Sequence, residues 1–185
     1  MNKLEKLLSR NWRGIGCCAA IVERMYPNYC LFSELSEFGD ATVFRNGLDL
    51  VWSCVADHRQ SIDFSKQLDK LEPLTPDIVD FDFFGVRPAI DACVALSLLF
   101  DVCALNEPLD FTNFVAINHS TISAYLEAIE YRDEFDEHPL LLDANRFVKE
   151  LSTRLSDDRL APKEWVSELR MLINNYDGSN IGIET

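Results

Sequence analysis

The stretch Phe83–Leu105 constrains the fold of this chain more than any other part of its sequence. From Pro88 onward, the stretch is apolar on every side of a helical wheel. Three polar residues interrupt the pattern: Asp91, Ser97 and Asp101. A helix that is apolar all round is normally surrounded by other helices. The sequence therefore predicts an all-α fold, a multihelical bundle around a buried central helix at residues 89–105.

A membrane-spanning helix is the other structure that such an apolar run can form. Residues 89–105 are slightly short of the ~20 residues that a spanning helix needs. The run also carries Asp91 and Asp101, and an aspartate costs about 2.5–3.5 kcal/mol near the centre of a membrane helix. Lys and Arg do not cluster at its ends. We therefore expect a buried helix of a soluble protein and no association with a membrane.

The rest of the chain also has helical patterns. Its seven prolines precede or open apolar runs of helical period, and no stretch alternates apolar and polar residues as a strand would. At 185 residues the chain has the usual length of one domain. We expect a single helical domain over residues 1–185, with a short non-helical tail at 177–185. The other predicted helices cover residues 3–8, 12–25, a segment opened by Pro27, and residues 41–56, 64–71, 111–131, 139–155 and 162–176.

Polar residues before the helices support these boundaries, because an oxygen-bearing side chain there can accept free backbone N–H groups. The aspartates in such positions are Asp40, Asp63 and Asp110. Thr75 is predicted to cap a short turn before the central helix. In the tail, Ile181 and Ile183 are expected to dock on the helices.

The net charge of the chain limits the kinds of molecule that it is expected to bind. Acidic residues outnumber basic residues 31 to 17, which gives a net charge of −14. Nucleic acids and anionic membrane surfaces are bound through Lys and Arg, so we expect neither as a partner. The six cysteines lie within apolar helical patterns, and none forms a C-x-x-C pair. Because the first residues also lack the apolar run of an export signal, we expect reduced core cysteines and a cytoplasmic protein.

Three charged residues form the candidate site: Glu23, Arg24 and Asp91. The carboxylate of Asp91 faces apolar neighbours on the helical wheel, so it needs a partner or its pKa must rise. Helix packing could bring Arg24 or Arg45 to Asp91 as a buried ion pair. Structurally, such a pair would fix helix register. Functionally, it would bind a small anionic or zwitterionic ligand. We favour the structural interpretation, because buried charges are usually paired.

No metal or cofactor is expected. Asp77, Asp80 and Asp82 cluster before the central helix, but their spacing is not that of a calcium-binding loop, and a capped, solvated acidic turn is the better interpretation. The three histidines belong to no zinc or di-iron motif. The chain has neither a glycine-rich phosphate loop nor a G-x-S-x-G motif, so no catalytic residue is predicted and enzymatic activity stays an open question.

Several local strings resemble one known family. They lie at residues 23–29 (ERMYPNY), 38–40 (FGD), 85–86 (GV), 88–96 (PAIDACVAL) and 179–183 (SNIGI). Their order and content are similar to those of the YjaG-like family of proteobacterial proteins, a family defined as a domain of unknown function. Arg87 departs from the pattern, since the family has an aromatic residue there. The resemblance implies an all-helical bacterial protein and transfers no catalytic residue.

Two hypotheses about function follow. The first is a non-enzymatic protein that acts through contacts with another protein or with a second copy of itself. The alternative is a small-molecule-binding protein or an enzyme, with its site around Glu23, Arg24 and Asp91. The alternative requires these side chains to line an open pocket. The first hypothesis requires them to be buried and paired, with an exposed apolar patch elsewhere.

Overall fold

Helices make up the whole regular structure of residues 3–184, which are the residues that the computed structural model describes. No strand occurs among these residues, so the all-α prediction is confirmed. The α-helices are α1 (Lys3–Ser36), α2 (Ala41–Ala56), α3 (Phe64–Leu71), α4 (Val86–Ala104), α5 (Phe111–Ala128), α6 (Pro139–Leu155) and α7 (Pro162–Asn174). Three short 3₁₀ turns lie at Glu72–Leu74, Ile78–Asp80 and Phe135–Glu137.

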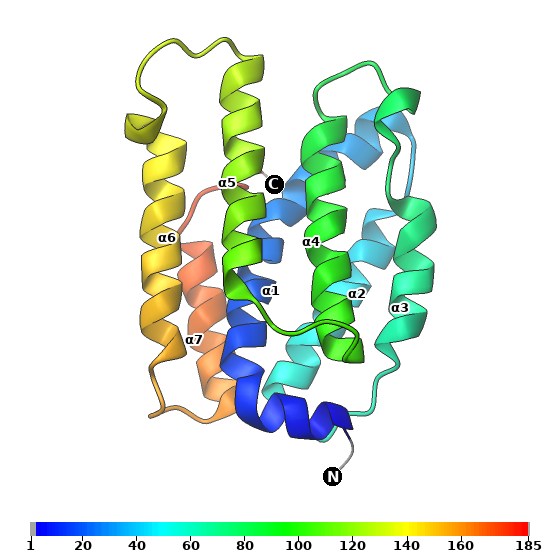
Figure 1. Ribbon diagram of the computed structural model, residues 1–185, viewed down its shortest axis with the longest axis vertical. Coiled ribbons are helices and arrows are strands. Elements are labelled where there is room, and N and C mark those ends of the chain that lie inside the picture. The colour runs from blue at the N-terminus through cyan, green and yellow to red at the C-terminus, as the bar shows by residue number, and fades with distance from the viewer. Residues whose placement is uncertain (1–2, 185) are drawn as a thin grey trace.

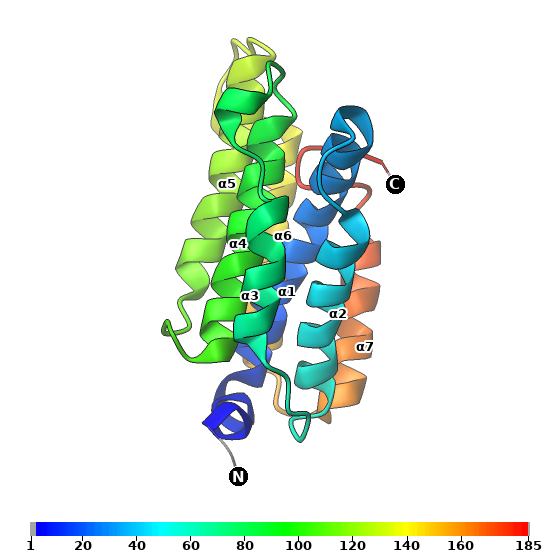
Figure 2. The same ribbon diagram turned by 90° about the vertical axis from the view of Figure 1, so that its right-hand side faces the viewer.

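Two helices share the centre of the bundle. The predicted central helix, α4, packs against α1, α2, α3 and α5. The long helix α1 packs against α2, α4, α5, α6 and α7, and therefore links both sides of the molecule. Figure 2 shows α1 between a layer made by α3, α4 and α5 and a second layer that contains α2 and α7. In Figure 1 the first turns of α1 lie across one end of the bundle.

One edge of α4 reaches the surface. Val94 is 40% exposed, and Ile90, Ser97 and Asp101 on the same edge are half-buried. Most of the other apolar residues of α4, such as Leu96 and Leu99, are buried. No helix in the described part of the chain has the length and apolar character that crossing a membrane requires.

The prediction of three separate N-terminal helices is wrong. Residues 3–36 form one continuous helix that runs through Pro27. Proline has no N–H to donate to the carbonyl of Glu23 four residues earlier, and its ring crowds the preceding turn. The backbone N–H of Asn180 donates to the carbonyl of Arg24 at 3.0 Å. A hydrogen bond from the distant tail therefore satisfies one of the groups beside the proline.

The predicted caps of the later helices are largely confirmed. Asp40, Asp63 and Asp110 accept backbone N–H groups at the starts of α2, α3 and α5. The cap of the turn before α4 is Asp77 and not Thr75: Asp77 accepts the N–H of Val79, whereas the Thr75 hydroxyl donates backward to the carbonyl of Leu71. Helices α5 and α7 end two or three residues before their predicted ends.

The tail after α7 is not helical, and it docks as expected. Ile181 is buried among the apolar side chains of α5 and α6, and Ile183 packs against the same cluster. The backbone N–H of Ser179 donates to the carbonyl of Ile183 at 2.8 Å, and its hydroxyl accepts the N–H groups of Ile181 and Ile183. The tail thus forms a tight turn that packs against α1, α5 and α6.

Candidate functional site

Glu23 belongs to a charged network at the surface between α1 and α2. The Arg45 guanidinium donates to both carboxylate oxygens of Glu23, and it donates to Asp49 Oδ1 at 2.8 Å. Trp52 Nε1 donates to Glu23 Oε2 at 2.7 Å, and Arg170 reaches Asp49 at 3.2 Å. The partners of Arg45 are therefore Glu23 and Asp49, and the predicted Arg45–Asp91 pair is wrong.

Arg24 points to a different neighbour from Glu23, toward α6 and the tail. It is only 5% exposed, and its guanidinium lies over the rings of Phe147 and Tyr176, 5.0 and 4.8 Å from their centres. Its Nη2 donates to the carbonyl of Ser179 at 3.4 Å. Burial lowers the pKa of the guanidinium, and the charge of Asp143 opposes this shift. Arg24 forms no ion pair in the described part of the chain.

Asp91 lies at the interface of α4 and α5, away from both arginines. Thr121 Oγ1 lies 2.7 Å from Asp91 Oδ2 and 2.9 Å from the carbonyl of Ile117. Burial raises the pKa of the Asp91 carboxyl, while the hydrogen bond from Thr121 and the charge of Arg87 act in the opposite direction. The structure therefore does not form the predicted Arg24–Asp91 pair. The expectation that an unpaired Asp91 has a raised pKa matches this environment.

The raised pKa of Asp91 makes a prediction about stability and pH. A carboxyl with a higher pKa in the folded chain than in the unfolded chain stabilises the fold below the unfolded pKa of about 4. That contribution is lost as the pH rises through the folded pKa. Asparagine does not ionise, so we expect Asp91→Asn to gain stability relative to the wild type between acidic and neutral pH. Urea denaturation of both proteins over a pH series measures this difference.

A surface substitution, Asp69→Asn on the exposed face of α3, is the control for this pH series. We expect its difference from the wild type to show no such gain. The opposite slope for Asp91→Asn, with the wild type losing more stability toward acid, would mean that the ionised carboxylate is the stabilised form.

Apart from Arg24, the sequence predicted no role for the deeply buried polar residues. The others are Asn28, Asn118, Thr121, Ser179 and Asn180. Asn28 Nδ2 donates to Asn180 Oδ1 at 2.8 Å, and Asn180 Nδ2 donates to the carbonyl of Asn118 at 3.4 Å. Asn28, Ser179 and Asn180 lie in the sequence strings that carry the family resemblance. Those strings were the signal in the sequence that could have indicated these residues. The network ties the tail to α1 and α5.

Glu23 and Arg24 do line a common opening, which we call the polar cleft. Its volume is about 520 Å³. The lining residues are Glu23, Arg24, Tyr26, Pro27, Arg45, Ile173, Asn174, Tyr176, Asp177 and Gly178. Asp91 is not among them, so the three predicted site residues do not form a single site. The polar cleft joins α1, α2 and α7 to the first residues of the tail.

A second opening, which we call the apolar groove, lies where the end of α1 meets the start of α4. Its volume is about 320 Å³. The lining residues are Asn28, Leu31, Phe32, Leu35, Phe83, Phe84, Gly85, Pro88, Tyr125, Ile181, Gly182 and Ile183. Leu35 is 66% exposed, and Leu31 and Phe83 are also exposed. The groove shares no lining residue with the polar cleft.

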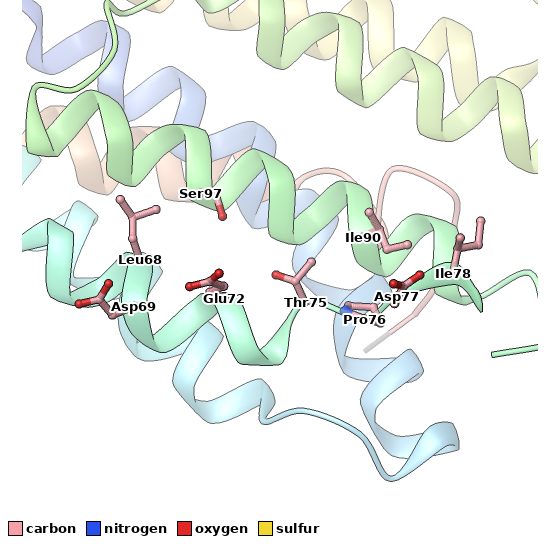
Figure 3. A pocket seen from close by; sticks show the side chains of 9 residues that line it. All are labelled: Leu68, Asp69, Glu72, Thr75, Pro76, Asp77, Ile78, Ile90 and Ser97. Carbon is pink, nitrogen blue, oxygen red and sulfur yellow. The ribbon is translucent and has the colours of Figure 1, made fainter. Parts of the chain in front are cut away.

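A third opening, of about 650 Å³, lies between α3 and α4 and is acidic (Figure 3). The carboxylates of Asp69 and Glu72 line one wall, across from Ile90 and Ser97 of α4. Asp77, at its end, accepts a backbone N–H in the capped acidic turn that the sequence predicts. The described residues contain no group of His, Cys, Asp or Glu side chains placed to hold a metal ion.

The six cysteines form no disulfide, and five of them are buried. Burial raises the pKa of Cys17 and Cys93 to about 12 and of Cys54 to about 11. Cys30 is half-buried, and burial raises its pKa as well. A thiol with a raised pKa is a poor nucleophile at neutral pH. These environments fit the prediction of core cysteines.

Comparison with known proteins identifies the relatives of this chain. The family model described as "Protein of unknown function (DUF416)" matches residues 1–184. The chain belongs to the DUF416 family. The solved structures include a DUF416 family protein from Shewanella baltica OS155. Its crystal structure superimposes with a TM-score of 0.84 at 31% identity, and the match covers 100% of both chains.

Curated DUF416 relatives agree with the predicted resemblance to YjaG. The uncharacterized protein YjaG of Salmonella typhimurium is 35% identical, over 98% of this chain and 94% of its own length. YjaG of Escherichia coli K12 is 34% identical with the same coverage, and an uncharacterized protein of Haemophilus influenzae is 34% identical over 98% and 95% of the two chains. The resemblance to the YjaG-like family is therefore confirmed, and the names of these DUF416 proteins state no activity.

Proposed function

We propose that this DUF416 protein acts by binding another protein, and that the apolar groove is the docking site. The observation that carries the proposal is the group of large apolar side chains at the groove: Leu35 is 66% exposed, beside the exposed Leu31 and Phe83. Exposed apolar surface that lines a concavity is typical of interaction sites. A groove between helix ends also suits an amphipathic helix that inserts one or two apolar side chains.

The charges around the groove favour a basic partner. Four acidic residues that neighbour the groove lining in the sequence are exposed: Glu34, Glu37, Asp82 and Glu184. One basic residue in these segments, Arg87 in the first turn of α4, is also exposed. Complementary charge increases the association rate and excludes unsuitable partners. We therefore propose an amphipathic helix with apolar anchors and flanking Lys or Arg residues as the segment that binds.

The same charges argue against self-association through the groove. Two copies joined by a twofold axis would place the acidic rims against each other, because each copy presents the same patch. The net charge of −14 adds to this repulsion. It also supports the absence of nucleic acid and anionic membranes among the partners. A cytoplasmic location is part of the proposal and rests on the reduced, buried cysteines.

The test is photo-crosslinking in bacterial cells, with p-benzoylphenylalanine in place of Leu35. We expect one covalent adduct with a different protein. Mass spectrometry is expected to locate the linked peptide in a basic, amphipathic helix, because the groove presents apolar anchor sites inside an acidic rim. In the purified complex, rising salt is expected to weaken binding, since exposed charges are screened.

Two controls make this experiment specific. The same photo-reactive residue at Met171, which is 62% exposed on α7 and outside the groove, is expected to give no such adduct. Phe83→Ser in the Leu35-labelled protein is expected to remove the adduct, because Phe83 lines the groove. The absence of an adduct at Leu35, the same adduct at both positions, or an adduct with a second copy of the chain would each overturn the proposal.

The alternative function, a small-molecule site formed by Glu23, Arg24 and Asp91 together, is less well supported. Asp91 contacts Thr121 on α5, whereas Glu23 and Arg24 line the polar cleft. A ligand in that cleft would have no contact with the Asp91 carboxylate. Any small-molecule site must therefore be built from Glu23, Arg24 and their own neighbours.

A further inference from the structure

The polar cleft contains hydrogen-bonding groups that the protein itself does not use. Arg24 is only 5% exposed, and its Nε and Nη1 atoms have no hydrogen-bond partner in the described structure. Nε of Arg45, on the other side of the cleft, also has none. Buried donors are nearly always satisfied in folded proteins, and each exception calls for an explanation. The lining thus offers free donors to an acceptor, such as a carboxylate.

The cleft also offers free acceptors. Pro27 has no N–H, so the Glu23 carbonyl loses its usual partner in the helix, and none of the described residues outside α1 donates a hydrogen bond to that carbonyl. Glu23 and Pro27 both line the cleft. The carboxylate of Asp177 lines it too, is exposed, and has no ion pair among the described residues. A carbonyl and a carboxylate are the acceptors that an ammonium group requires.

The charged and apolar residues that line the cleft indicate the charge and the polarity of a ligand that would fit it. The lining contains Arg24, Arg45, Glu23 and Asp177, so its formal charge is balanced. The Glu23–Arg45 pair is internal to the protein, which leaves one cation and one carboxylate. Tyr26, Ile173 and Tyr176 supply apolar and aromatic surface beside these groups. A volume of about 520 Å³ lies within the range of small-molecule sites.

We propose that the polar cleft binds a zwitterionic amino acid with an apolar side chain. The ligand carboxylate accepts hydrogen bonds from Arg24. Its ammonium group donates to the Glu23 carbonyl and the Asp177 carboxylate. The side chain lies against Tyr26 and Tyr176. The site is independent of the apolar groove, because the two openings share no residue.

Three related probes separate the contributions of the two charged groups. L-phenylalanine has both groups, 3-phenylpropionate lacks the ammonium group, and phenethylamine lacks the carboxylate. Titration calorimetry with the wild-type protein is expected to show binding of L-phenylalanine, or of L-leucine or L-methionine, at millimolar or lower concentration. The two analogues are expected to bind at least about tenfold more weakly, since each lacks one charged group, and hydrogen bonds to charged groups are stronger than those between neutral groups. The Arg24 Nε–H resonance in nitrogen-15 NMR spectra is expected to shift with the amino acid.

Three variants test the assignment of residues. Arg24→Lys and Asp177→Asn are each expected to weaken binding about tenfold or more. Asp177 is exposed, so its variant is expected to fold even if Arg24→Lys does not. Asp133→Asn, an exposed aspartate after α5, is the matched control and is expected to bind as the wild type does. The proposal is overturned if none of the three amino acids binds, if 3-phenylpropionate binds as tightly as L-phenylalanine, or if Asp177→Asn leaves affinity unchanged.

Discussion

Replacement of Trp165 by alanine is expected to lower the free energy of unfolding by about 3–5 kcal/mol. Trp165 is 1% exposed and meets Trp12 edge to face, with ring centres 5.0 Å apart. Its Nε1 donates to the carbonyl of Arg154 at 3.1 Å. Alanine at this position leaves a large cavity between α1 and α7 and removes one hydrogen bond to the Arg154 carbonyl, which keeps the N–H of Asp157 as a partner. Urea denaturation measures the loss, which is a large fraction of the 5–15 kcal/mol that is typical of a domain.

Met171 provides the matched control for Trp165, because it is a large apolar residue on the same helix that is 62% exposed. We expect Met171→Ala to change stability by no more than about 0.5 kcal/mol. A similar small effect for Trp165→Ala would contradict the packing of α7 on α1.

A double-mutant cycle with Gly16 tests the same contact directly. A Cβ atom at Gly16 would lie 2.5 Å from the Trp165 ring, so Gly16→Ala is expected to destabilise the wild type by about 1–3 kcal/mol. In the Trp165→Ala background, the cavity accepts the new methyl group and the cost is expected to fall. Simple additivity of the two effects would mean that the residues do not touch.

The sequence predicted the helices well because their signals are local. Asp40, Asp63 and Asp110 stand directly before helices and accept backbone N–H groups there. The apolar pattern of α4 also predicted that this helix is largely buried. These features depend on residues within one or two helical turns, which a helical wheel represents correctly.

The course of α1 could not be predicted in the same way. Pro27 is a reasonable helix start by local rules. The helix instead continues through it, and the Arg24 carbonyl accepts an N–H from Asn180. A partner about 150 residues away in the chain leaves no local signal in a single sequence.

The three candidate site residues do not come together, and the reason is geometric. Consecutive residues on an α-helix point about 100° apart. Glu23 and Arg24 therefore face different neighbours, with Glu23 toward Arg45 on α2 and Arg24 toward Phe147 and the tail. The wheel correctly indicated that the Asp91 carboxylate lies among apolar neighbours. It could not indicate which helix each of them faces.

Replacement of Asn180 by alanine is the second substitution with a large expected effect. Asn180 is 1% exposed and links Asn28 of α1 to the Asn118 carbonyl of α5. Alanine leaves both partners buried without this hydrogen bond, at about 1–3 kcal/mol for each group. We expect a loss of about 2–4 kcal/mol in urea denaturation. Asn175→Ala, at an exposed asparagine after α7, is the control and is expected to cost no more than about 0.5 kcal/mol.

The effect of Asn180→Ala is expected to extend into α1. Once the tail loosens, the Arg24 carbonyl loses the N–H of Asn180, and the helix there loses support on the side where proline already removes a hydrogen bond. Hydrogen exchange is therefore expected to become faster both at the tail amides of Ser179 and Ile183 and in α1 around Pro27. Faster exchange in the tail alone would contradict this coupling, since α1 would then pass through Pro27 without help from the tail.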